Sequence, residues 1–133
     1  MSGGKRVDRV LSGGLLGFLD DFQHETGDDA GKDDVLFLRG WILGNGSLVR
    51  SVVLKRGKRE AVPIPYSLPR PDVAEAYPEE PRAAKAGFAG QVTMERTAVP
   101  LFLQRLLPER VDICAVLENG REIRCFSRGF PPP

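Results

Sequence analysis

Short β-prone runs separated by turn residues recur along most of this chain, and their spacing limits the folds that it can adopt. Each run is rich in Val, Ile, Leu or Phe, and Gly, Pro or Asn stands between many of them. Such spacing is typical of antiparallel sandwiches, whereas the repeated strand–helix units of a parallel α/β fold do not occur. We therefore predict an all-β, antiparallel sandwich. Its strands are expected at residues 15–22, 35–43, 47–55, 59–64, 88–95, 111–117 and 122–127.

Length and charge narrow the class of protein further. The 133 residues suit one domain, and 19 Lys+Arg against 18 Asp+Glu leave a formal net charge of +1. A nearly neutral chain has no general attraction for nucleic acid or for an anionic membrane. No apolar run approaches the roughly 20 residues that cross a bilayer, and no signal peptide is recognisable. We expect no nucleic-acid partner, no membrane insertion and a cytoplasmic location.

The composition of the two ends sets the expected domain limits. Residues 1–14 are rich in Gly, Ser and charge, so we expect a flexible N-terminal segment there. The sandwich domain is then predicted at 15–130, and the three prolines at 131–133 are read as a linker or tail. The leucine-rich residues 99–108 fit either a short helix or an irregular buried segment, and the sequence does not decide between them.

A proline-rich crossing segment begins at Tyr66 with the sequence YSLPRPDVAEAYP. Pro71 suits the first turn of a helix, where its missing N–H leaves no bond unmade. We expect a short helix at 72–77, which Pro78 ends, and a second helical turn at 83–86, which Gly87 closes.

Arg70 and Asp72 are the charged pair of this segment, and two roles are open to them. They could hold the polar groups of a ligand. Alternatively, Arg70 binds loop carbonyls or a carboxylate while Asp72 caps the short helix, so that the pair locks the crossing in place. We favour the lock, because a long crossing must satisfy its backbone polar groups somewhere and Arg offers five donors.

Three large aromatic side chains, Trp41, Tyr66 and Tyr77, could form a platform for a sugar ring. Trp41 follows Gly40 inside an apolar run, so we favour a buried position for it. Tyr66 and Tyr77 flank the crossing, and packing and surface contact are equally open to them. The residues predicted to lie inside the sandwich are Trp41, Val52, Leu54, Phe88 and Ile113.

Catalytic and metal chemistry have few candidates in this chain. His24 is the only histidine, Cys114 and Cys125 are the only cysteines, and no nucleophile, base and orienting group stand in a known spacing. Too few side chains are available for a structural zinc site. The basic side chains between residues 50 and 59 have no interleaved aromatics, so we expect them to serve solubility or edge protection rather than phosphate binding. We predict no enzyme activity, no cofactor and no metal.

Residues 111–127 form the clearest hairpin of the sequence, with Asn119-Gly120 read as a two-residue turn. That register places Cys114 opposite Cys125, within disulfide range. It also puts charged side chains on an apolar face, and a bulge that repaired this would move the thiols to opposite faces. We therefore predict that both cysteines are reduced.

Several of these motifs occur together in a known type of module. Gly-Trp at 40–41, Arg-Pro-Asp-Val at 70–73 and Gly-Phe at 87–88 stand in the same order as in immunoglobulin-like accessory β-sandwich domains of bacterial glycosyltransferases and other cell-surface polysaccharide enzymes. The chain resembles these domains over roughly residues 15–127, and it departs from them in its longer leucine-rich segment after Thr97. The resemblance implies an immunoglobulin-like sandwich without catalytic activity.

The expected function follows from that resemblance. It implies an accessory module in bacterial cell-surface glycan synthesis that binds carbohydrate or a partner enzyme. The candidate ligand-binding residues are Tyr66, Tyr77, Arg70 and Asp72. The alternative is a structural protein–protein interaction domain without affinity for sugar.

Overall fold

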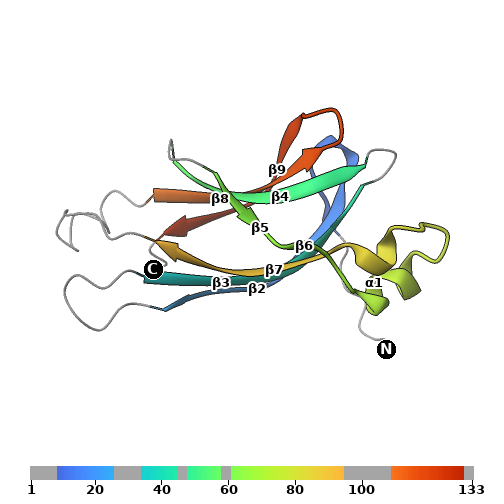
Figure 1. Ribbon diagram of the computed structural model, residues 1–133, viewed down its shortest axis with the longest axis horizontal. Coiled ribbons are helices and arrows are strands. Elements are labelled where there is room, and N and C mark those ends of the chain that lie inside the picture. The colour runs from blue at the N-terminus through green and yellow to red at the C-terminus, as the bar shows by residue number, and fades with distance from the viewer. Residues whose placement is uncertain (1–8, 26–33, 45–47, 58–60, 95–108, 131–133) are drawn as a thin grey trace.

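Two antiparallel sheets face each other in this protein, with the short helical crossing at one end (Figure 1). The computed structural model describes residues 9–25, 34–44, 48–57, 61–94 and 109–130. The predicted all-β antiparallel sandwich is confirmed. Its immunoglobulin-like type stays a prediction.

Strand order shows how the chain builds the two layers. The first sheet runs β1-β2-β3-β7-β6 and the second runs β5-β4-β8-β9. Pro65 separates β5 from β6 and is the point at which the chain changes sheet. The strands are β1 (Arg9–Val10), β2 (Leu16–Glu25), β3 (Asp34–Leu43), β4 (Val49–Arg56), β5 (Val62–Ile64), β6 (Tyr66–Leu68), β7 (Gly87–Met94), β8 (Glu109–Leu117) and β9 (Glu122–Phe130).

All seven predicted strands are present with shifted ends, and two short strands were not expected. β1 lies in the segment expected to be flexible, where Arg9 and Val10 pair with β2. β6 lies between two prolines and pairs with β7. The predictions for residues 99–108 and 131–133 lie outside the described residues.

The main core fills the space between the sheets. Alternate residues of each strand point inward, so the inner faces of β3, β4, β7 and β8 meet there. Of the residues predicted to be inside, Val52, Leu54, Phe88 and Ile113 belong to this core and are at most 1% exposed. Phe88 packs against Phe126 of β9 with 6.2 Å between ring centroids, so the core links the two sheets directly.

Trp41 is buried, as predicted, but on the other face of the first sheet. Its neighbours Leu38 and Ile42 point into the main core, whereas Trp41 belongs to a second apolar cluster with Leu43 and Val73. The crossing segment covers this outer face of β3. The prediction that Trp41 lies between the sheets is therefore wrong, because alternation along a strand does not tell which face a helix will cover.

The crossing contains the two helical turns that the sequence predicted. These are α1 (Pro71–Ala76), with Pro71 in its first turn, and η2 (Ala83–Lys85). A further 3₁₀ turn, η1 (Ser12–Gly14), precedes β2. Val73 and Ala83 are buried against Trp41, so the crossing is held to the sheet by apolar contact. No helix in the described ranges is long and apolar enough to cross a membrane.

The β8–β9 hairpin differs from its predicted register. The Leu117 N–H donates to the Arg121 carbonyl at 2.8 Å, so the loop has three residues, with Gly120 at φ 88°. The Arg121 N–H donates to the Asn119 side chain at 2.9 Å, which closes the loop. Glu118, Asn119 and Gly120 therefore form a three-residue loop, with Gly120 in the left-handed conformation. The prediction of a two-residue turn is wrong.

The shifted register separates the two thiols. Cys114 pairs with Arg124 rather than with Cys125. A bulge lies between Ile113 and Cys114 in the ladder, and Cys125 is its extra residue. Cys125 packs against the main core, and both cysteines are free thiols. The three-residue loop, and not this bulge, brings Ile123 opposite Ala115 on the apolar face, so the repair differs from the one that the sequence suggested. The free thiols agree with the prediction that both cysteines are reduced.

Alkaline pH is expected to destabilise the protein through these thiols. Burial raises the pKa of Cys114 to about 11 and that of Cys125 to about 12. Because a thiol in the unfolded chain ionises near pH 9, the unfolded state loses its protons first, and stability present below that pH is lost as pH rises toward 11. We expect the urea midpoint to fall over this window. The fall should be smaller in a Cys114→Ala/Cys125→Ala variant, and an equal fall would assign it to other groups.

Candidate functional site

A pocket of about 310 Å³ opens where the crossing meets the start of β4. Its volume is at the lower end of the range for small-molecule sites, about 300–1,000 Å³. The apolar walls come from Leu48, Val49, Pro81 and Ala84, and the polar groups come from Tyr66, Ser67, Arg82 and Lys85.

Tyr66 is the one predicted ligand-binding residue that lines this pocket. Its hydroxyl donates to the Ile42 carbonyl at 2.7 Å, and its ring packs partly against the main core. Burial raises the pKa of Tyr66 to about 12, and the positive charge of Arg82 opposes the rise. Tyr66 is therefore a fixed, neutral part of the wall at physiological pH.

Ser67 stands beside Tyr66 in an unusual conformation. It is the extra residue of a bulge, since Tyr66 pairs with Phe88 and Leu68 pairs with Gly87. Its φ of 65° lies in the left-handed region, which disfavours residues with a Cβ. Bulges often redirect a side chain next to a functional site. Here the bulge places Ser67, which is exposed, in the wall of the pocket.

Two basic side chains complete the pocket, and the sequence analysis named neither. Arg82 is the N-cap residue of η2, and Lys85 is its last residue. In a 3₁₀ turn, residues three apart lie above one another, so the turn presents both side chains on one side. The sequence shows that Arg82 and Lys85 are three residues apart, but only the fold shows that they line the same pocket as Tyr66.

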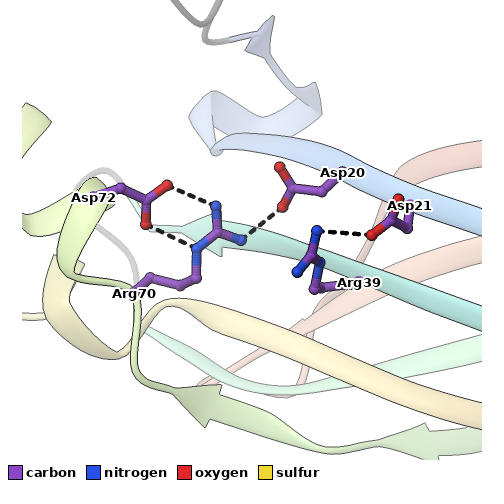
Figure 2. A network of polar contacts seen from close by, with 5 residues as sticks. All are labelled: Asp20, Asp21, Arg39, Arg70 and Asp72. Atoms are coloured by element: carbon purple, nitrogen blue, oxygen red, sulfur yellow. Dashed lines mark hydrogen bonds and ion pairs between the residues drawn. The ribbon is translucent and has the colours of Figure 1, made fainter.

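Arg70 and Asp72 form the lock that the sequence favoured (Figure 2). Arg70 Nε and Nη2 donate to the two oxygens of Asp72 at 2.9 and 2.8 Å, and Nη1 donates to Asp20 at 2.7 Å. Asp20 is the extra residue of a bulge between Leu19 and Asp21 of β2. The bulge lets Asp20 reach Arg70, while Asp21 pairs with Arg39 across the strands.

The lock joins three parts of the chain. Besides its side-chain bonds to β2 and α1, Arg70 donates its backbone N–H to the Ala84 carbonyl at 2.7 Å. The hydrogen bonds to Asp72 raise the pKa of the guanidinium, which therefore stays charged. Arg70 is the N-cap residue of α1, and no side-chain hydrogen bond caps the helix there. The Asp72 carboxylate binds Arg70, and the predicted cap by Asp72 stays a prediction.

Tyr77 does not line the pocket. It packs against Trp41 with 6.0 Å between ring centroids and an interplanar angle of 55°, in the cluster beneath the crossing. Tyr66 and Tyr77 are therefore on different surfaces and do not form one platform. A ligand role for Tyr77, Arg70 or Asp72 stays a prediction.

Comparisons of the chain with protein-family models, curated proteins and solved structures find no match. The likeness to accessory domains of glycosyltransferases therefore rests on the motifs alone. Function has to be argued from the pocket and its charges.

The sequence also raised a metal site and the basic stretch of β4 as candidates. Within the described ranges, no three His, Cys, Asp or Glu side chains are placed to hold a metal ion. In the basic stretch of β4, Lys55 pairs with Glu122 at 2.8 Å and Arg56 is only 8% exposed. These two cations are therefore poorly placed to contact a phosphate backbone.

Proposed function

We propose that this protein is a non-catalytic binding module and that the pocket beside β6 holds a sugar. The observation that supports this most is the pocket itself, which combines apolar walls with the Tyr66 ring and several polar groups. A sugar offers a patch of C–H groups and a rim of hydroxyls, and such walls match both. With the motifs at 40–41, 70–73 and 87–88, we infer an accessory role in bacterial cell-surface glycan synthesis.

The surroundings of the pocket hold its walls in place before a ligand arrives. Tyr66 is held by its bond to Ile42, and η2 is held by the backbone bond between Arg70 and Ala84. A site whose walls are fixed before the ligand arrives loses little entropy on binding.

An Ala84→Trp variant tests this proposal. Ala84 is exposed and lines the pocket, so an indole at this position would fill the cavity without disturbing a core contact. We expect backbone amide NMR signals of the wild-type protein near residues 66–67 and 82–85 to shift on titration with a sugar panel. In Ala84→Trp these shifts should be lost.

Ala76→Trp is the matched control, because Ala76 is also an exposed alanine but ends α1 outside the pocket. It should bind as the wild type does. If no sugar shifts the signals of the wild-type protein, the proposal fails in favour of an interaction domain without sugar affinity. That alternative agrees with the structural partners found for Arg70, Asp72 and Tyr77.

A further inference from the structure

The pocket beside β6 contains two positive charges and no acidic side chain among its lining residues. Arg82 and Lys85 come from the same short turn and line it together with Tyr66 and Ser67. We propose that the ligand is a sugar with an anionic group, a carboxylate or a phosphate, and that Arg82 and Lys85 bind this group. This inference rests on the proposed function and names the class of ligand.

Neither cation is neutralised by the part of the chain that the structure describes. Arg39, Lys55 and Arg70 each have a carboxylate oxygen within 2.8 Å. No such ion pair is found for Arg82 or Lys85 among the described residues. A single unpaired surface cation is common. Two that line one cavity raise the potential inside it, because concave low-dielectric walls concentrate the field.

The neutral groups of the pocket support the same reading. Tyr66 keeps its proton at physiological pH, since burial raises its pKa to about 12, so it adds no negative charge. Arg82 lines the same pocket as the Tyr66 ring. An anion held by Arg82 would therefore have the Tyr66 ring and the exposed Ser67 as neighbours, which suits the rest of a sugar.

The two cations differ in what they offer an anion. The Arg82 guanidinium can donate two parallel hydrogen bonds to a carboxylate or phosphate, whereas the Lys85 ammonium acts as a mobile point charge. Glu80 is an acidic residue next to this turn. Its Oε1 accepts a hydrogen bond from the Arg82 backbone N–H at 3.5 Å. Its charge opposes anion binding, so its removal provides a test with the opposite sign.

The test titrates the isotope-labelled full chain with glucuronate, glucose 6-phosphate and glucose at neutral pH. We expect either charged sugar to bind at least about tenfold more tightly than glucose, because hydrogen bonds to ionised groups are the stronger ones. Raising NaCl from about 20 mM to about 300 mM should weaken the binding of the charged sugar and leave that of glucose unchanged. The better of the two charged sugars identifies the anionic group.

Charge variants assign the effect to residues. Arg82→Gln and Lys85→Gln should each weaken binding of the charged sugar about tenfold, and Glu80→Gln should strengthen it a few-fold. Arg110→Gln, at an exposed arginine at the start of β8 and outside the pocket lining, should change nothing.

Three results would overturn the inference. If glucose binds as tightly as glucuronate, the preference for charge is wrong while the proposed sugar site stands. If acetate or inorganic phosphate alone binds as tightly as the charged sugars, the ligand is a simple anion and the sugar is wrong. If none of the probes binds, both this inference and the proposed function fail.

Discussion

Gly40→Ala is expected to lower the free energy of unfolding by at least about 3 kcal/mol. A Cβ at this position would overlap the Phe18 carbonyl oxygen and lie 2.8 Å from Cζ of Phe88. Gly40 pairs with Leu19 on one side and Phe88 on the other, so it stands between two paired strands. Neither contact can be relieved by moving the end of a flexible side chain alone.

The neighbours of Gly40 have little room to move. Phe88 is 1% exposed and packs against Phe126, so its ring cannot retreat without disturbing the main core. The Phe18 oxygen belongs to the backbone of β2, which is held by its ladder with β3. Relief therefore requires a shift of a strand, which costs more than a side-chain change.

Gly129→Ala is the matched control for this prediction. Gly129 also lies in a strand, and nothing stands within 4 Å of the position that its Cβ would take. Its free energy of unfolding, from urea titration, should stay within about 0.5 kcal/mol of wild type. Equal midpoints for Gly40→Ala and wild type would mean that β2, β3 and the Phe88 ring are not as closely packed as described.

The strands were predictable because their causes are local. Alternating apolar residues in β4 and β8 and the glycine-containing turns between strands are properties of neighbouring residues. Pro71 marks the start of α1 for the same reason, since proline fits the first turn of a helix. Sequence reasoning therefore recovered the order of the elements and both helical turns.

The positions of Trp41 and Asp20 depend on contacts between distant residues. Trp41 is buried only because a segment more than 30 residues later in the chain folds back over β3, and β3 is apolar on both faces. Asp20 meets Arg70 across 50 residues through a bulge that no turn residue announces. Local patterns contain neither the covering segment nor the partner.

The pocket residues were missed for a further reason. Arg82 and Lys85 lie in a short polar turn whose composition is typical of an ordinary solvated surface. Ser67 gives no sign of its left-handed backbone, because Gly or Asn are the residues that normally indicate it. The site exists only once the fold brings β6 and η2 together.

Arg70→Ala is expected to destabilise the domain by about 3 kcal/mol, the lower end of what breaking a buried ion pair costs. The side chains of Arg70 and Asp20 are only 14% and 11% exposed, so loss of the guanidinium leaves the Asp20 carboxylate poorly solvated. Arg70→Lys should recover part of this loss, because an ammonium restores the charge but cannot bind both carboxylates in the observed geometry. Urea midpoints of the three proteins measure the difference.

The two carboxylates of the lock are not equivalent. Asp72 makes two of the three hydrogen bonds to Arg70, but its side chain is 43% exposed, so water screens the pair. We therefore expect Asp72→Asn to cost less than about 1 kcal/mol and Asp20→Asn to cost more. The reverse order would mean that the ion pair with Asp72 of α1 stabilises the crossing more than the ion pair with Asp20 of β2 does.

A double variant separates the energy of the Arg70–Asp20 ion pair from the other contributions of the two side chains to stability. If the cost of Arg70→Ala comes from removing the positive charge beside Asp20, then Arg70→Ala/Asp20→Ala should be more stable than the sum of the single changes predicts, by about 1 kcal/mol or more. Additive costs would show that the ion pair contributes little. An Arg70→Ala protein with an unchanged midpoint would leave Arg70 free for the ligand role that the sequence also allowed.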